Sequence, residues 1–421
     1  MGEIRNMNSS YKYLLEFLNL AIHNNANVNN DNKYEDLNIE ELYNIAQKHK
    51  ITSLIYGVLS NIKNLDKNSE AMKSWKMQSI IVEMNQIQRS MEFLKVYDDM
   101  LKKNIKPIVV KGIVCRNLYP NPDSRISGDE DILIREEDFK LCDEALINNN
   151  IVNFENKSFN DSDVVTYFRN DIKLAIEVHK TLFNEDEEEH VHLFNEFYKN
   201  CFEEYMELNI NGKKVYTFHH TMNLLYLISH TAKHFLHGGV GIRQVCDIIK
   251  FIEVYHNEIN WTDLWDKLKS VKYDYFTFAL LSIGELYLGL DNNLVKYPSY
   301  YNKEEIDCRY LLEDILDAGI FGDSTMERKQ SALITLDAVN NSNKSNSKFR
   351  FVSALFPSAS KLQGRYSYLK DKPFLLPIAW CDRIYNYSKE KKLSGNVKDS
   401  AYKSISIGNK RVELLKLYKI I

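Results

Sequence analysis

The sequence predicts an α+β protein in which a mixed β-sheet core is flanked by N-terminal and C-terminal helical regions. Apolar residues recur at helical spacing over residues 11–103 and again after residue 219. Between them, β-branched runs bounded by turn residues recur over 105–218. Glycine and proline number only 15 and 7 among 421 residues, and because both interrupt regular structure, their scarcity favours long helices.

The N-terminal region, residues 1–104, is expected to be mostly helical. Leu14, Leu18 and Ile22 fall on one face of a helix, which predicts packing against neighbouring helices. Residues 72–103 contain neither glycine nor proline, and this segment therefore predicts one long helix.

The sheet core is expected over residues 105–218. Its strand-like and helical segments alternate, a pattern typical of a small α/β module. Strand-like runs lie at 105–110, 129–134, 163–169 and 172–179, and an amphipathic helix is expected at 136–148. A helical domain is expected over 219–339, followed over 340–421 by a linker and a C-terminal tail that packs on the body.

The charge balance disfavours a general nucleic-acid binder. Lysine and arginine total 54 against 58 acidic residues, a formal net charge of −4, whereas duplex binding needs a concentrated basic surface. The six cysteines are scattered, which favours reduced thiols in a cytoplasm over a disulfide framework. The N-terminus lacks a signal peptide's apolar stretch, and no segment reaches the roughly 20 apolar residues of a bilayer span. We expect a cytoplasmic protein without a membrane partner.

Two aspartates mark the candidate catalytic chemistry. Asp129 and Asp131 are two residues apart on an expected strand, so their side chains point to one face, about 6.6 Å apart. Converging carboxylates repel one another unless a cation lies between them, and oxygen ligands of this kind suit Mg²⁺. Glu177, on the strand expected at 172–179, either points to solvent or joins this acidic site.

The residues before this acidic strand are suited to bind phosphate. Lys111 and Gly112 end the first strand where a helix follows, which leaves backbone N–H groups able to bind an anion. Gly112 lets a phosphate approach the backbone, and Lys111 adds a positive charge. Arg125, just before Ser127 and Gly128, either grips a phosphate or forms a surface ion pair.

These motifs, taken in order, resemble a known family. The relevant segments are Pro107–Gly112 (PIVVKG), Leu118–Pro120, Arg125–Ile134 (RISGDEDILI) and Ile176–His179 (IEVH). Together they are similar to the uncharacterised nucleotidyltransferase family within the DNA polymerase beta superfamily. The likeness extends to His230–His234, to the helix Arg243–Asp247 and, in the tail, to Phe356-Pro357 and Arg365-Tyr366.

The resemblance implies a nucleotidyltransferase-like core with a two-metal site. Asp129 and Asp131 would ligate Mg²⁺, and Glu177 would be the third ligand that also positions the attacking hydroxyl. Two Mg²⁺ ions, for which Mn²⁺ can substitute, would neutralise a nucleoside triphosphate, and ATP is the expected donor.

The resemblance also implies a nucleotide-binding loop. Lys111-Gly112 stands where the superfamily more commonly has Gly followed by Gly or Ser, and a lysine there is chemically suited to a triphosphate. The residues expected to bind the nucleotide are Lys111, Gly112, Arg125, Ser127 and Gly128.

Histidines gather downstream, with eight of the eleven between residues 179 and 237. His230 and His234 share one helical face, as zinc ligands can, but the residues between them lack the glutamate of a zinc-hydrolase motif. A structural or substrate-contacting role is therefore favoured over zinc, and a hydrogen-bond network between helices is the alternative to a substrate cleft. The expected cleft residues are His179, His230, Lys233, His234 and Arg243, with Asp247 as the ion-pair partner of Arg243.

The expected function is Mg²⁺-dependent transfer of a nucleoside monophosphate from an NTP to an unidentified acceptor. A small molecule or a protein hydroxyl is favoured as acceptor, and nucleic acid is the least favoured because of the charge balance. Two alternatives stay open. One is a non-catalytic nucleotide-binding or regulatory protein with the same fold, and the other is a metal-dependent hydrolase that uses the histidine cluster.

Overall fold

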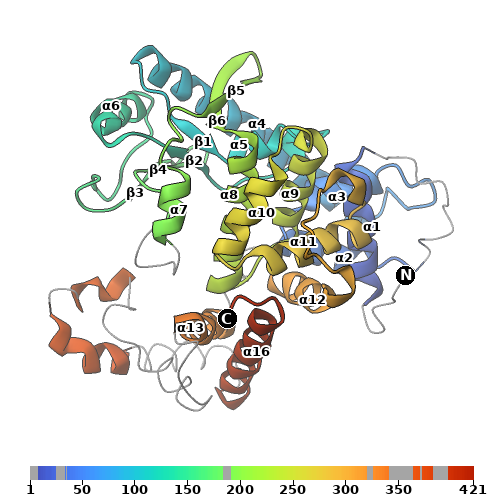
Figure 1. The fold of residues 1–421 in the computed structure, drawn as a ribbon. Coiled ribbons are helices and arrows are strands. Elements are labelled where there is room, and N and C mark those ends of the chain that lie inside the picture. Colours follow the sequence, from blue (N-terminus) through green and yellow to red (C-terminus); the bar gives the residue numbers. More distant parts are fainter. Residues whose placement is uncertain are drawn as a thin grey trace. The chain divides into compact units, whose positions relative to one another are not determined.

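The computed structural model describes residues 8–24, 34, 36–183, 191–319, 326–340, 364–369, 372–382 and 397–421. The chain forms two compact units (Figure 1). The first comprises Met1–Thr231 and Ile242–Arg309, and the second comprises Ala232–Gly241 and Tyr310–Ile421. Each unit is described by itself. The tail motif Phe356-Pro357 lies outside the described residues.

The first unit begins with four helices, as the apolar periodicity predicts. They are α1 (Ser9–Ile22), α2 (Ile39–Lys48), α3 (Thr52–Leu59) and α4 (Glu70–Lys102). The side chains of Asn8, Asn38 and Ser69 accept hydrogen bonds from the first turns of α1, α2 and α4 and so satisfy donors that a helix leaves unpaired. The 33-residue α4 confirms the expected long helix.

A six-stranded mixed sheet forms the core, in the spatial order β3-β4-β2-β1-β6-β5 (Figure 1). β2 runs antiparallel to β1 and parallel to β4, while β1 is parallel to β6. The sequence predicted the first four strands, each of which begins slightly later than expected. The strands are β1 (Ile108–Val110), β2 (Glu130–Leu133), β3 (Val164–Arg169), β4 (Leu174–His179), β5 (Tyr205–Ile210) and β6 (Lys213–Phe218).

Helices connect and follow the strands of the first unit. α5 (Gly112–Arg116), α6 (Phe139–Asn148) and α7 (Val191–Phe197) lie between strands, and α6 matches the expected amphipathic helix. After β6 come α8 (His220–His237), α9 (Ile242–Tyr255), α10 (Trp261–Ser270) and α11 (Asp274–Tyr287). An α+β fold with a mixed sheet and flanking helices is therefore confirmed. Within the described ranges, no helix has the length and apolar character needed to cross a bilayer.

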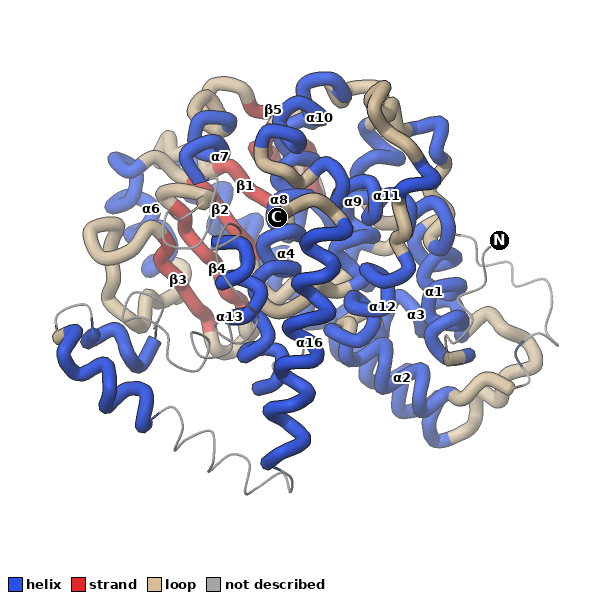
Figure 2. Tube along the Cα trace, turned by 60° about the horizontal axis from the view of Figure 1, so that its bottom comes forward, coloured by secondary structure: helices blue, strands red, loops and turns tan. Residues whose placement is uncertain are grey.

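The second unit is helical. It contains the last residues of α8 together with α12 (Arg309–Ala318), α13 (Met326–Asn340) and α16 (Val397–Leu417). α13 and α16 lie side by side, and Ile334, Ala338 and Val412 pack between them (Figure 2). The fully buried guanidinium of Arg411 stacks over the Phe235 ring, 5.3 Å from its centroid, so cation–π attraction offsets part of its burial cost.

In the first unit, the buried Glu130 at the start of β2 joins that strand to α5. Its Oε1 atom lies 2.6 Å from Arg116 Nη1, and its Oε2 atom accepts the N–H of Ile113 at 2.8 Å. Gly112 makes this approach possible, because its φ is +45° and a Cβ there would lie 2.1 Å from Oε2. Glu130 therefore caps α5 and neutralises a buried arginine at once.

We predict that Glu130→Gln lowers the free energy of unfolding by about 3–5 kcal/mol, because it leaves the Arg116 charge buried without a partner. Urea unfolding followed by circular dichroism measures the change. The control is Glu203→Gln, which removes an exposed pair with Arg135 and should cost under about 1 kcal/mol. Equal effects of the two variants would contradict the role of Glu130.

Candidate functional site

Three potential metal ligands converge on neighbouring parallel strands. Asp131 on β2 lies opposite Glu177 on β4, and His179 follows two residues later on the same face of β4. One ligand atom from each residue lies within 4.8 Å of the other two. His179 Nε2 is 3.2 Å from Asp131 Oδ1 and 3.6 Å from Glu177 Oε2. Glu177 is the most accessible of the three, with 34% of its side chain exposed.

Lys111 supplies a positive charge to this cluster. It immediately precedes α5, with φ +53°, and its Nζ atom lies 3.0 Å from Asp131 Oδ2 and 3.3 Å from His230 Nε2. Burial alone would raise the pKa of Asp131, but Lys111 and His179 outweigh it and hold that pKa below its usual range. Lys111 therefore stays protonated and partly neutralises a buried carboxylate.

Asp129 lies beside the cluster, in the loop just before β2. Burial and the negative charges of Asp131 and Glu177 raise the pKa of Asp129, although Lys111 opposes the shift. The mutual repulsion expected among the three acids is therefore present at Asp129. Among the described residues, the ligand group that the geometry assembles contains His179 in place of Asp129.

The donor set fits a hard divalent cation. Asp131 Oδ2 is buried and has the Lys111 ion pair but no aligned hydrogen bond, and Asp131 and Glu177 offer the oxygen ligands that Mg²⁺ and Mn²⁺ prefer. His179 Nδ1 is also buried without a hydrogen-bond partner among the described residues. Asp131, Glu177 and His179 are the residues that would hold a metal, with Asp129 close enough to add charge.

Arg125 does not point into this cluster. Its guanidinium is buried and binds Asp247 through two hydrogen bonds, one of them from Nε to Oδ1 at 3.0 Å. Tyr119 Oη donates to the same carboxylate at 2.8 Å. The prediction of an ion pair between Arg243 and Asp247 is wrong. Asp247 pairs with Arg125, and Arg243 Nη1 donates to the carbonyl of Ile126.

The other expected nucleotide-binding residues divide between a buried network and an open loop. Ser127 is buried, where its N–H donates to Gln86 Oε1 at 3.0 Å and its hydroxyl bonds Arg116 and Glu130. Gly112 lies against Glu130, whose carboxylate already takes the Ile113 N–H at the start of α5. Gly128 is exposed with open space around it, so it alone of these three lies free of the network.

The expected cleft residues also separate. His179 joins the ligand group, and His230, stacked on Tyr226, contacts Lys111. Lys233 and His234 follow on α8 but belong to the second unit. Among the described residues, the group of candidate metal ligands includes neither His230 nor His234.

His179 is a candidate metal ligand that the sequence indicated only as a residue of a substrate cleft. The sequence contained a signal for this role. His179 lies two residues after Glu177, and strand alternation places both side chains on one face of the sheet. The contact between Lys111 and Asp131 had no such local signal. It depends on β1 and β2 being neighbours, with Val110 paired to Asp131.

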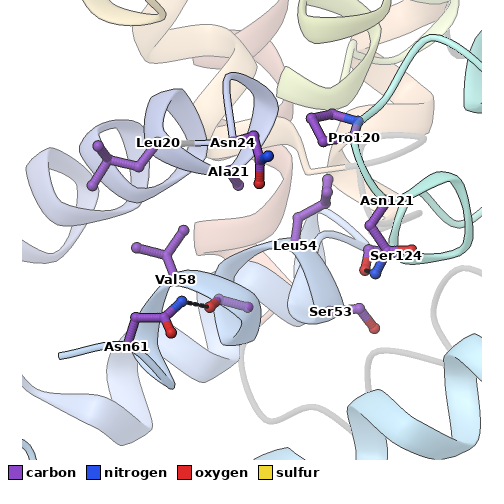
Figure 3. A pocket seen from close by; sticks show the side chains of 11 residues that line it. Leu20, Ala21, Asn24, Ser53, Leu54, Val58, Asn61, Pro120, Asn121 and Ser124 are labelled. Atoms are coloured by element: carbon purple, nitrogen blue, oxygen red, sulfur yellow. Dashed lines mark hydrogen bonds between the residues drawn. The ribbon is translucent and has the colours of Figure 1, made fainter. Parts of the chain in front are cut away.

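A hollow of about 170 Å³ lies away from these charges, between α1, α3 and the turn before Arg125 (Figure 3). No ionisable side chain lines it, so it lacks the chemistry to hold a metal or a triphosphate. Its lining residues are Leu20, Ala21, Asn24, Ser53, Leu54, Gly57, Val58, Asn61, Pro120, Asn121 and Ser124.

Comparison with family models identifies the protein family. A model described as an uncharacterised nucleotidyltransferase matches residues 35–289, which include every residue of the acidic cluster. The chain belongs to the uncharacterised nucleotidyltransferase family. Membership indicates a transferase and confirms the resemblance on which the sequence analysis relied. Comparison with curated proteins and with solved structures found no match.

We predict that Asp247→Asn lowers the free energy of unfolding by about 3–5 kcal/mol, because Arg125 would keep a buried charge without its partner. Chemical unfolding measures this loss. Asp171→Asn is the control, since the Asp171 carboxylate is exposed and its pair with Arg169 should contribute under about 1 kcal/mol. If Asp247→Asn leaves stability unchanged, Arg125 is not held as described.

A pH dependence follows from His179. The Asp131 and Glu177 carboxylates outweigh burial and raise the pKa of His179 from 6.5 to about 9. Since the folded state binds this proton more tightly, the stabilisation is complete below pH 6.5 and is lost as pH rises through 9. The shift corresponds to about 3 kcal/mol.

We therefore predict that metal-free wild type loses more stability between pH 6 and pH 10 than His179→Gln does. Urea unfolding in chelator-containing buffer at several pH values measures the difference. Parallel pH profiles for the two proteins would show that His179 is not held by the carboxylates.

Proposed function

We propose that this protein catalyses Mg²⁺-dependent transfer of a nucleoside monophosphate from an NTP, with ATP as the expected donor, to the hydroxyl of an acceptor. One observation carries the proposal: Asp131, Glu177 and His179 converge on adjacent strands with their ligand atoms within 4.8 Å. Family membership supports the same class of reaction. A small molecule or a protein hydroxyl is the favoured acceptor, because the net charge of −4 disfavours a long nucleic acid.

Each residue of the cluster has a distinct part in this proposal. Asp131, Glu177 and His179, supplemented by Asp129, would hold Mg²⁺, which when bound neutralises phosphate charge and lowers the pKa of an attacking hydroxyl. Glu177 is accessible enough to orient that hydroxyl. Lys111 lies within reach of the same face and remains positively charged, so it can attract a phosphate oxygen.

A second candidate function is nucleotide binding without transfer. The observation that favours it is the buried Glu130 carboxylate, which accepts the hydrogen bond of the Ile113 N–H at the start of α5. This N–H is therefore not available to a phosphate. In this alternative a nucleotide still binds through Lys111, but the Ile113 N–H is not available to stabilise charge on a reacting phosphate. The two candidates differ in whether pyrophosphate is released.

The test is incubation of the protein with mixed NTPs, Mg²⁺ and a cell extract, followed by mass spectrometry of products and a pyrophosphate assay. We predict that Asp131→Asn and Glu177→Gln each lower the rate at least about 100-fold, because each removes charge aimed at the reacting phosphate. Glu207→Gln, an exposed acid on β5, is the matched control and should keep full activity.

Stability measurements separate loss of chemistry from loss of folding. Asp131→Asn should cost stability in metal-free buffer, since Asp131 pairs with Lys111 and His179, whereas Asp129→Asn should not, because burial and like charges oppose its ionisation. A wild type that binds ATP yet releases no pyrophosphate with any extract would favour the non-catalytic alternative. Full activity of Glu177→Gln would remove Glu177 from the site.

A further inference from the structure

A second hollow, of about 220 Å³, lies within the first unit and is lined in part by Ile126, three residues before Asp129. It forms where the corner between α2 and α3 meets α4 and Ile126. Its lining residues are Tyr43, Gln47, Lys50, Thr52, Gln78, Val82, Asn85, Arg89 and Ile126. Seven of these nine side chains are polar, two carry positive charge and none is acidic, a lining suited to a hydrophilic anion.

Arg89 is fixed at this hollow by backbone carbonyls. Its Nε donates to the carbonyl of Ile172 at 3.1 Å, and its Nη1 donates to the carbonyl of Ser127 at 3.3 Å. Among the described residues, no carboxylate lies within ion-pair distance of Arg89. Its guanidinium is therefore held in place with its charge uncompensated by an ion pair, which is the preorganised state that anion binding requires.

Lys50, just past the end of α2, also lines the hollow. Its N–H donates to the carbonyl of Gln47, and the next N–H, of Ile51, donates to that of Ala46, the bond pattern that places a left-handed residue after a helix. Lys50 takes this position with φ +51°, where glycine is favoured. Partial desolvation and Arg243 lower the pKa of Lys50, whereas Asp129 raises it, so Lys50 lies close to both charges.

The backbone conformation of Lys50 is not itself the signal. α10 ends in the same way at Lys272, with φ +59°, at an exposed position outside any described hollow. What distinguishes Lys50 is its place on a polar, cationic hollow whose wall includes Ile126, three residues before Asp129. Lys272 therefore offers a matched comparison for charge and backbone conformation.

We propose that the hollow lined by Lys50, Arg89 and Gln78 binds the phosphate group of a small phosphorylated acceptor. The identification of the ligand as the acceptor rests on the proposed function. The binding of phosphate in this hollow does not depend on it. The hollow lies next to the Asp129 loop, whereas Lys111 lies at Asp131. The two sets of cations thus serve separate anions, one from the acceptor and one from the NTP.

The test is titration of the full chain with inorganic phosphate in chelator-containing buffer, followed by phosphorus NMR or calorimetry. Saturable binding is expected in wild type. Lys50→Asn should weaken it at least about tenfold, the effect of losing one charge-assisted hydrogen bond, because asparagine tolerates the left-handed conformation but carries no charge. Lys272→Asn should bind phosphate like wild type.

A second pair of variants keeps the test sharp if Lys50→Asn folds poorly. Gln78→Glu places a negative charge in the hollow and should abolish phosphate binding, while Gln88→Glu makes the same change on an exposed part of α4 and should not. Absence of saturable binding in wild type, or equal losses in each pair, would overturn the site.

A nucleotide carries phosphate too, so a final arm separates the two sources. Phosphate titration is repeated with Mg²⁺ and a saturating non-hydrolysable ATP analogue. Simultaneous binding of both supports the acceptor assignment, and displacement of phosphate by the analogue overturns it. The phosphate titration in chelator-containing buffer requires neither a metal ion nor catalytic turnover. Phosphate binding without any transferase activity would therefore count against the proposed function and not against this site.

Discussion

Two neighbouring carboxylates on β2 constrain the structure around them. Strand alternation sends Glu130 and Asp131 to opposite faces, and both are nearly fully buried. A buried carboxylate is tolerated only with a cation or with hydrogen bonds, so each side of the strand must provide one. Glu130 meets Arg116 and the start of α5, whereas Asp131 meets Lys111 and His179.

The two carboxylates differ in whether they keep an oxygen atom that could bind a metal ion. Both oxygen atoms of Glu130 have partners, because Arg116, the Ile113 N–H and the Ser127 hydroxyl bind them. Asp131 keeps an oxygen with no aligned hydrogen bond and faces the partly exposed Glu177 across the parallel strand pair. The structural contacts of Glu130 and the proposed metal ligation by Asp131 thus lie on opposite faces of one strand.

Local sequence patterns could predict the strands and the acids, but not every partner. The pattern 129–134 predicted a common face for Asp129 and Asp131, yet β2 begins at Glu130, so alternation does not govern Asp129. Asn211-Gly212, with φ of 50° and 76°, forms the turn between β5 and β6, and this dipeptide is a local signal for a hairpin. The Arg125–Asp247 pair joins residues 122 positions apart, and no local pattern specifies such a contact.

In the proposed function, Asp131, Glu177 and His179 form one divalent-cation site. Electron paramagnetic resonance of the protein titrated with Mn²⁺ tests it most directly, with spin-echo detection of nitrogen coupled to the bound ion. We expect saturable Mn²⁺ binding that weakens in Asp131→Asn, together with a nitrogen coupling that disappears in His179→Gln. Mn²⁺ binding of wild-type strength in Asp131→Asn would contradict it.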